Sequence, residues 1–573
     1  MVNPFLGLEH RRPDVDLEEA ARLLLAGWGR TGVVRQLGSH QDRNILVDGP
    51  DGRFVLKVAR HGISRRELDA ENGAMRHVAE AGVSFAVPVP VPALDGSLVV
   101  ALPMRTGVVH DVRLVTFVDG TPLEDHRFFA PAVLRAHGSM AGELAVALAG
   151  FDHPGLDRAF QWDLRYAADI CDALAPFAST PDRRELLDAS IARAMAVLEP
   201  LTPDLRVQAI HADITDQNTL ATPDAAGRPM PSGIIDFGDV SRTWLAAELA
   251  VTIAADTMFD LGRPIQLARS IAEGFTARLP LAAAELRATW PLVLARAASV
   301  AISGDHQASL EPDNRYVIES REAEWAALEA IAAVPFELAT EALREAAGLG
   351  PVERPVVKRA VAPVLADPPV PMVLDLSTTS DALDGAAIGD TGAVGPLVAA
   401  AEAAGCMAVG RWGEARLVDT VLDAVDEPST IHLGVDLFAP AGSGVQAPVG
   451  GLVRHVSGAV VVEGVEDLVL WGVDAVVAAG DRVEAGDRIG TVAADAPDGL
   501  PPHVHVQRVL EPGLDAPRRA VPSLASAWQR LCPDPSAILG LEPAIAAAPA
   551  DDPRALLARR DAVLATTQEH YFD

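Results

Sequence analysis

Hydrophobic and polar positions follow different patterns in the two halves of the chain. In the first 120 residues, short apolar runs alternate with polar turns. These runs predict helices over 16–29 and 64–81, and strands over 33–37, 43–47, 53–58, 97–103 and 112–118. From about 130 to 200, and again from about 240 to 347, apolar residues recur at helical spacing. Strands followed by helices predict a two-lobed α+β unit, with an N-lobe over 1–115 and a helical C-lobe over 116–347.

A Pro-rich stretch, residues 348–371, separates this unit from a region of different texture and predicts a linker. Beyond it, short Val-rich runs are punctuated by Gly and Asp, which is typical of closely spaced strands. We therefore expect a compact all-β domain over 372–535. Residues 536–573 are Ala-rich and then charged, and they predict a helical tail.

Composition narrows the class of partner. With 47 basic and 79 acidic residues, the formal net charge is −32, which disfavours nucleic acids and anionic membranes as partners. The three cysteines are far apart in the sequence and predict neither a disulfide framework nor a thiolate metal site. We find no secretory signal and no apolar stretch long enough to span a bilayer, so we expect a cytoplasmic location. The sequence leaves open whether the chain forms a homo-oligomer.

The segment from His211 to Asn218, followed two dozen residues later by Ile-Ile-Asp236-Phe-Gly-Asp239, carries the chemistry of phosphoryl transfer. Asp213 is the candidate catalytic base, because a carboxylate can orient an acceptor hydroxyl and take its proton. Asn218 and Asp236 offer the hard oxygen ligands that Mg²⁺ prefers, with Asp239 as an additional candidate. We expect His211 to be structural.

Nucleotide-binding candidates lie upstream of this segment. Lys57 is on a predicted strand, and a helical glutamate would hold it toward the phosphates; we prefer Glu71 to its neighbour Glu67. The loop between the first two strands should cover the phosphates, with candidates Ser39 and His40. The segment 114–120 predicts a hinge whose backbone, at Thr116 and Val118, could bind adenine.

Together these motifs resemble the aminoglycoside phosphotransferase-like kinases, specifically the hydroxylysine-kinase-like branch, over residues 30–340. The resemblance implies a protein-kinase-like fold, ATP or in some members GTP as phosphate donor, Mg²⁺, and a small hydroxylated amine or amino acid as acceptor. It places Trp162 and Arg165 on the acceptor side.

A second constellation follows in His432-Leu-Gly-Val-Asp436 and His503-Val-His505. Two histidines and a carboxylate with an open fourth position are typical of a catalytic zinc. The pattern resembles the lysostaphin-like zinc metallopeptidases, which implies that His432, Asp436 and His505 bind Zn²⁺ and that His503 is catalytic. That family has a further histidine where this chain has Leu470-Trp-Gly-Val-Asp474.

The order of the two domains resembles fusion proteins that continue into a class-III aminotransferase-fold lyase, and the tail resembles the entrance to that domain. The resemblance implies such a lyase as a partner that consumes the phosphorylated product. Our primary hypothesis is an ATP-dependent kinase. A zinc-dependent peptidase, or a non-catalytic assembly module, remains the alternative.

Overall fold

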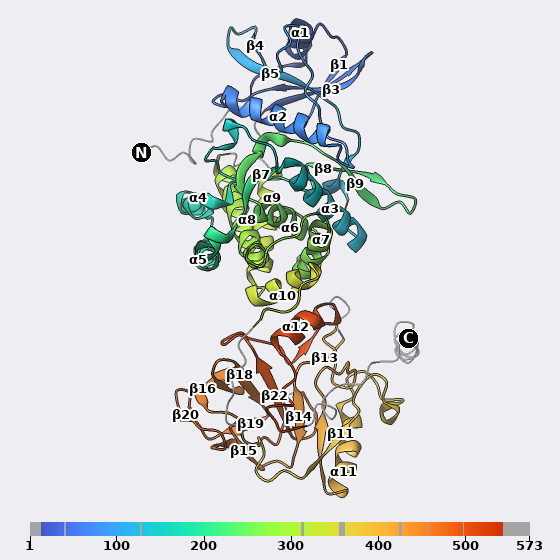
Figure 1. Cartoon of the computed structure of the whole chain (residues 1–573), viewed down its shortest axis with the longest axis vertical. Coiled ribbons are helices and arrows are strands. Elements are labelled where there is room, and N and C mark those ends of the chain that lie inside the picture. The colour runs from blue at the N-terminus through green and yellow to red at the C-terminus, as the bar shows by residue number, and fades with distance from the viewer. Residues whose placement is uncertain are drawn as a thin grey trace. The chain divides into compact units, whose positions relative to one another are not determined.

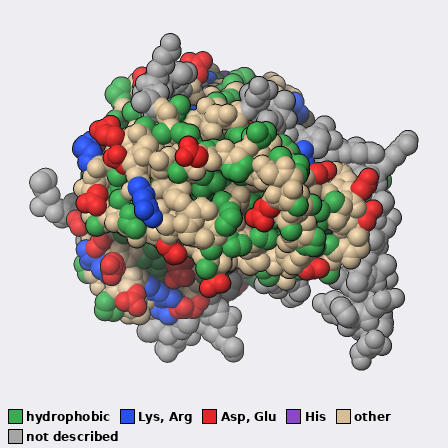
Figure 2. Space-filling view, turned by 90° about the horizontal axis from the view of Figure 1, so that it is seen from below, with side chains coloured by type: hydrophobic (Ala, Val, Ile, Leu, Met, Phe, Trp, Pro, Cys, Tyr) green, Lys and Arg blue, Asp and Glu red, His purple; other side chains and the backbone are tan. Residues whose placement is uncertain are grey.

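The chain, seen here in a computed structural model, divides into two compact units, Met1–Leu349 and Gly350–Asp573 (Figure 1). The structure describes residues 13–38, 42–126, 129–310, 315–353, 361–422, 427–456, 458–496 and 498–541. No helix in these ranges is both long and apolar enough to cross a membrane. Figure 2 shows acidic side chains scattered among apolar and neutral ones on one face, in keeping with the acidic composition.

The first lobe of the N-terminal unit is built on a five-stranded antiparallel sheet of order β1-β2-β3-β5-β4. Its strands are β1 (Val33–Gln36), β2 (Arg43–Gly49), β3 (Gly52–Val58), β4 (Val100–Pro103) and β5 (Val109–Thr116). Leu56 and Leu114 of the sheet form a core with Leu23 and Leu24 of α1 (Leu17–Trp28). Side chains alternate along a strand, so this packing leaves Lys57 on the opposite face.

Helix α2 (Arg65–Ala81) lies between this sheet and the second lobe (Figure 1). It begins at a capping box in which Ser64 and Glu67 bond each other's backbone N–H groups. The predicted helices and strands of this lobe are all present, with ends shifted by up to three residues. The strand expected at 97–103 starts later, at Val100, and the strand expected at 112–118 starts earlier, at Val109.

The second lobe is mainly helical, as its apolar periodicity predicts. Its helices are α3 (Pro131–Leu148), α4 (Ala167–Leu174), α5 (Pro181–Leu201), α6 (Ala246–Thr257), α7 (Pro264–Arg278), α8 (Ala283–Leu310), α9 (Arg315–Ala332) and α10 (Phe336–Ala346). Helix α8 is buried over much of its length and contacts α4, α5, α6, α9 and α10. It is the centre around which the lobe packs.

Short strands in this lobe carry the motif region. β7 (Val207–Ile210) pairs with β10 (Ser241–Trp244), and β6 (Thr121–Pro122), β8 (Thr219–Pro223) and β9 (Pro229–Ile234) form a second small sheet. Of these pairs, β8 and β9 are consecutive and form a hairpin. They hold the loops that carry the phosphoryl-transfer motifs.

The C-terminal unit is rich in strands. Its largest sheet has the order β11-β12-β14-β22-β18-β17-β16-β20. The strands are β11 (Val370–Leu374), β12 (Cys406–Gly410), β14 (Val435–Phe438), β16 (Gly451–Val456), β17 (Ala459–Glu463), β18 (Asp467–Trp471), β20 (Arg482–Val483) and β22 (His503–Val509). Smaller sheets contain β15 (Gly444–Gln446), β19 (Val473–Ala475) and β21 (Arg488–Val492), and β13 (Ile431–His432) with β23 (Arg519–Ala520). A core of buried, mostly Val and Leu side chains joins these sheets.

The expectation that this domain is all-β is wrong. Strands β11 and β12 run parallel, and α11 (Gly395–Ala403) connects them. Parallel neighbours need a crossover connection, which the Ala-rich segment supplies as a helix. A second helix, α12 (Ala525–Leu531), follows the last strand.

The predicted linker, 348–371, ends inside the C-terminal unit. Val364 and Leu365 are buried in its core, Leu365 bridges Val445, and β11 begins at Val370. Residues 354–360 of the linker and residues 542–573 of the predicted tail lie outside the described part of the chain.

Helices α3 and α7 pack against each other through glycines. A Cβ added to Gly138 would lie 1.9 Å from the carbonyl oxygen of Ile271, and one added to Gly274 would lie 1.9 Å from that of Arg135. Each position therefore depends on the absence of a side chain, because the obstructing atom belongs to the backbone.

We predict that Gly138→Ala lowers the free energy of unfolding of the N-terminal unit by about 1–3 kcal/mol, because the helices must separate to admit the methyl group. Urea unfolding followed by circular dichroism measures the change. Gly150→Ala is the control, since a Cβ there has its nearest neighbour, His77, at 4.0 Å. Equal stability of the two variants would contradict this account of the helix contact.

Candidate functional site

The loop between β7 and β8 places Asp213 beside Asn218. One Asp213 carboxylate oxygen, Oδ2, accepts a hydrogen bond from Asn218 Nδ2 at 2.6 Å, and the same nitrogen donates to the Asp213 carbonyl at 3.1 Å. The other oxygen, Oδ1, pairs with Arg296 Nη2 of α8 at 3.1 Å. The loop thereby holds Asp213 in one orientation.

A buried carboxylate supports this loop from below. Glu248 of α6 accepts hydrogen bonds from the backbone N–H groups of His211, at 3.0 Å, and of Ala212, at 2.8 Å. Ala212 has a φ of 65°, which a residue with a side chain rarely adopts. Glu248 stabilises that conformation and was missed in the sequence, where it looks like one more helical glutamate.

His211 is structural in character, as expected. Its ring is fully buried, packs edge-on against Phe237 at 4.7 Å, and its Nδ1 accepts the Asp213 N–H at 3.3 Å. Burial lowers the pKa of His211 to about 4, so the ring is neutral at physiological pH.

The pairing of β8 with β9 brings Asn218 to Asp236. Asn218 comes directly before β8 and Ile235 directly after β9, where Thr219 pairs with Ile234 in antiparallel register. The Ile235 N–H donates to the Asn218 carbonyl at 2.9 Å, which extends the ladder by one bond. Two side chains 18 positions apart in the sequence therefore occupy one end of the same hairpin.

Asp236 lies within reach of the first lobe. Lys57 Nζ of β3 is 3.2 Å from Asp236 Oδ1, and the Lys57 charge holds the pKa of Asp236 at about 2. The carboxylate is therefore ionised at neutral pH, as a ligand for a divalent cation must be. Its backbone φ of 60° turns the chain sharply after β9.

Glu71 has a different partner from the one predicted. Its carboxylate contacts Arg113 Nη2 of β5, and Arg113 also lies 3.7 Å from Asp42 Oδ2. Arg113 is paired across the sheet with Lys57, so the two cations share one face. Among the described contacts, Glu71 forms an ion pair with Arg113, and Lys57 forms one with Asp236. The signal in the sequence was an arginine within an otherwise apolar run.

Of the remaining candidates for nucleotide binding, the structure describes Thr116 and Val118. Ser39 and His40 lie outside the described residues. The Thr116 N–H donates to the Val89 carbonyl at 2.9 Å, so that group is used within the lobe. Val118 is buried in the connection between the lobes.

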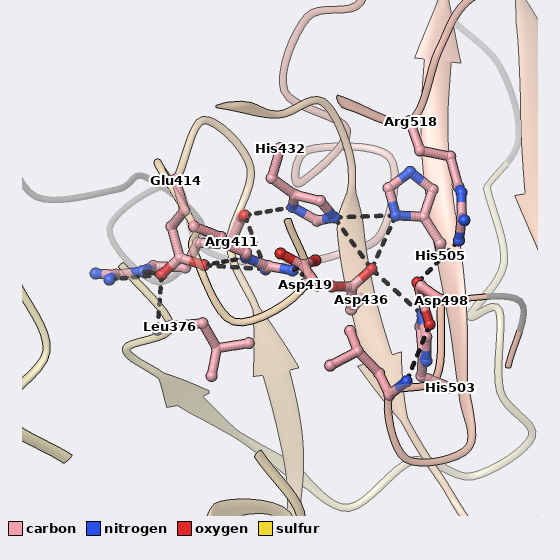
Figure 3. Close-up of polar contacts among 12 residues, drawn as sticks. Leu376, Arg411, Glu414, Asp419, His432, Asp436, Asp498, His503, His505 and Arg518 are labelled. Carbon is pink, nitrogen blue, oxygen red and sulfur yellow. Dashed lines mark hydrogen bonds and ion pairs between the residues drawn. The ribbon is translucent and has the colours of Figure 1, made fainter. Parts of the chain in front are cut away.

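In the C-terminal unit, the three predicted zinc ligands lie together (Figure 3). Asp436 of β14 stands directly opposite His505 of β22, and His432 is four residues earlier in β13. His505 Nδ1 is 2.8 Å from Asp436 Oδ1 and 3.0 Å from His432 Nε2, and His432 Nε2 is 3.2 Å from Asp436 Oδ1. Ligands of a tetrahedral zinc lie about 3.3 Å apart for bonds near 2.05 Å, so the cluster is close to the required size.

The protonation states of His505 and Asp436 are those that a bound cation requires. His432 Nδ1 lies 2.8 Å from the Arg411 carbonyl, and this contact turns Nε2 of the ring toward the cluster. Burial lowers the pKa of His505 to about 4, so this ring is neutral. Burial opposes ionisation of Asp436, yet His432 and Arg416 hold its pKa well below the ordinary value.

Arg416, which the sequence analysis missed, fixes the orientation of Asp436. This fully buried guanidinium bonds Asp436 Oδ2 at 2.6 Å and Glu414 at 2.9 Å, leaving Asp436 Oδ1 for the cluster. His503, the predicted catalytic group, has its Nε2 3.7 Å from Asp436 Oδ1 and 3.6 Å from Asp498 Oδ2 (Figure 3).

In the segment where the sequence resemblance implies a further histidine, this chain has Trp471. Trp471 of β18 pairs with His505 across the sheet, and the two rings meet edge-on at 5.2 Å. His455 lies elsewhere, on β16, and contacts the Val477 carbonyl. An indole N–H can donate a hydrogen bond, but the ring carries no positive charge and cannot transfer a proton as an imidazole does.

Comparison with known proteins agrees with the chemistry of the N-terminal unit. Residues 33–286 match a family described as "Phosphotransferase enzyme family". Hydroxylysine kinase of Danio rerio is 26% identical over 324 residues, which cover 54% of this chain and 89% of that protein. Homoserine kinase of Paramagnetospirillum magneticum is 28% identical over 269 residues, covering 45% of this chain and 76% of that protein.

The solved structure of a microcompartment-associated aminopropanol kinase superposes with a TM-score of 0.44 at 19% identity, covering 58% of this chain and 99% of that chain. The residues that the family matches all lie in the N-terminal unit. The family match and the sequence relatives support a phosphotransferase activity of this unit.

We predict that Glu248→Gln destabilises the N-terminal unit by about 1–3 kcal/mol, because the glutamine amide leaves one of two buried N–H groups without an acceptor. The rate of phosphoryl transfer should fall as well, since Ala212 and Asp213 lose their support. Unfolding and steady-state kinetics measure the two effects. Glu185→Gln, on an exposed position of α5, is the control and should change neither.

Proposed function

Because the N-terminal unit is a domain of the phosphotransferase family, we propose that this chain is an ATP-dependent kinase of the hydroxyl group of a small amine or amino acid. The observation that carries the proposal is the convergence of Asp213, Asn218 and Asp236 beside Lys57. The acceptor class is supported by relatives named for kinases of hydroxylated amino acids, hydroxylysine and homoserine.

Each residue has a role in this reaction. Asp213 orients the acceptor hydroxyl and takes its proton as the oxygen bonds to the γ-phosphorus and the bond to the departing ADP breaks. Lys57 offsets phosphate charge. Asn218 and Asp236 offer the oxygen ligands for Mg²⁺, which when bound neutralises charge on the phosphates. Glu71 acts through Arg113, and we assign Ser39, His40 and Val118 to the nucleotide, whereas Thr116 is bonded to Val89 within the lobe.

The product of this reaction is a phosphate ester of an amino alcohol or amino acid. Such an ester is a substrate for a lyase that expels phosphate, and we propose an aminotransferase-fold enzyme as the partner that consumes it. A cytoplasmic location is consistent with the supply of ATP.

We predict that Asp213→Asn lowers kcat by about 10²–10⁴-fold, because an amide cannot take the proton of the hydroxyl. ADP release during turnover of hydroxylated amines and amino acids measures the rate, and calorimetry with a non-hydrolysable ATP analogue should show nearly unchanged binding. Asp172→Asn, on an exposed position of α4, is the control. Turnover by Asp213→Asn at the rate of the unmodified protein would refute the role of this carboxylate.

A second function is favoured by the histidine cluster. We propose that His432, Asp436 and His505 of the lysostaphin-like C-terminal unit bind Zn²⁺. The donor set, its separations near 3 Å and its burial support the ion. In this assignment His503 is the catalytic group. Trp471 in place of a histidine favours a metal site with weak hydrolysis over an efficient peptidase, and a structural role in assembly is the alternative.

We predict one zinc per chain after purification without chelator, and its loss in His432→Ala, because two ligands do not retain the ion. Elemental analysis measures the stoichiometry. His455→Ala, which removes a histidine outside the cluster, should keep the metal. Peptide hydrolysis that disappears in His503→Ala while zinc remains would assign a peptidase activity, and a zinc-free wild-type protein would rule out the metal site.

A further inference from the structure

Arg296 is the buried cation next to the proposed catalytic base. It belongs to α8, is 6% exposed, and its Nη2 pairs with Asp213 Oδ1 at 3.1 Å. Its guanidinium carbon lies 4.6 Å from the centre of the Trp162 ring, so the group is stacked on an aromatic face. Two contacts in different directions hold the planar group in place.

One nitrogen of this guanidinium is unused. Nη1 of Arg296 is buried and has no hydrogen-bond partner among the residues that the structure describes. A buried charged donor without a partner is unfavourable, so its presence suggests that a ligand supplies the acceptor. The position of Nη1 beside Asp213 indicates a ligand that arrives with the acceptor.

Arg296 and the proposed Mg²⁺ ligand Asn218 approach the base through different atoms. Asn218 and Arg296 bond different oxygens of Asp213, Oδ2 and Oδ1 respectively. Lys57 and Asp236 lie on the Asn218 side, because Asn218 and Ile235 are joined through the β8–β9 hairpin. Arg296, stacked on Trp162, therefore contacts the base through the oxygen that Asn218 leaves free.

We propose that Arg296 binds the carboxylate of the acceptor, which makes the substrate a hydroxylated amino acid rather than a simple amino alcohol. This inference rests on the proposed kinase function and narrows its substrate class. A guanidinium recognises a carboxylate by charge-assisted hydrogen bonds, and its rigid plane gives the contact a fixed direction. Arg296 thus sets the distance between the carboxylate and the hydroxyl that Asp213 orients.

Pairs of acceptors that differ only by loss of the carboxylate test the proposal. Homoserine is compared with 3-aminopropan-1-ol, and 5-hydroxylysine with 1,5-diaminopentan-2-ol. In the wild-type protein, kcat/KM should favour the amino acid of the accepted pair by about 10- to 100-fold, expressed mainly in KM. Equal use of the amino acid and the amino alcohol would overturn the inference and leave the kinase function intact. Absence of ADP release with every acceptor would refute both.

The variant Arg296→Gln adds a second readout. Because Arg296 also contacts Asp213, kcat should fall for both members of a pair, but the preference for the amino acid should disappear. The control is Arg193→Gln, which removes an arginine stacked at 4.0 Å on Phe336 and should keep the preference. An unchanged preference in Arg296→Gln, with kcat lowered equally for both acceptors, would mean that Arg296 acts only by orienting Asp213, and would overturn the carboxylate assignment.

Discussion

The antiparallel pairing of β8 with β9 is the constraint on which the proposed phosphoryl-transfer site depends. It brings the end of the catalytic loop, at Asn218, against the turn that carries Asp236, and the Ile235 N–H bond to the Asn218 carbonyl closes the pair. A shift of one residue would turn one of these side chains to the other face of the hairpin. The remaining contacts of the site are built on this arrangement: Lys57 meets Asp236, and Asp213 meets Asn218.

At this site, two residues with strained backbone conformations are each accompanied by stabilising contacts with charged side chains. Ala212 and Asp236 both have positive φ, at 65° and 60°. Two hydrogen bonds to Glu248 support the first, and the Lys57 ion pair accompanies the second. Strain of this kind persists only where the surroundings hold it in place, and it is common at sites whose side chains must point in one direction. Glu248 is thus as much a part of the loop as the residues of the motif.

In the C-terminal unit, strand pairing and a buried arginine likewise position the side chains of the proposed site, although the chemistry differs. The pairing of β14 with β22 sets Asp436 opposite His505, and β13 brings His432 to them. Arg416 takes the second oxygen of Asp436, as Arg296 takes one oxygen of Asp213. In both units, a buried guanidinium bonds one oxygen of a carboxylate whose other oxygen contacts a further side chain of the site. Removal of either arginine would leave a buried charge without its partner.

The sequence by itself determined the α+β character of the first unit, its strands and helices, and the residues of the two motifs. The strand β3 and the helix α2 can be predicted from the local periodicity of their apolar residues, because this pattern does not depend on the rest of the chain. The helix α11 between parallel strands was not predicted, because the Ala-rich segment around 395–403 carries no sign of where its flanking strands pair. The sequence predicted that the second unit is rich in strands, but it did not predict which strands pair with each other.

Only the tertiary structure decided which charges meet. Glu71 pairs with Arg113 rather than Lys57, because β3 and β5 are neighbours in the sheet and place two cations on one face. Arg296 and Arg416 reach their carboxylates from positions 83 and 20 residues away, which no local pattern connects. Ion pairs depend on distances in space, and spacing along the chain sets those distances only within a helix turn or a strand pair.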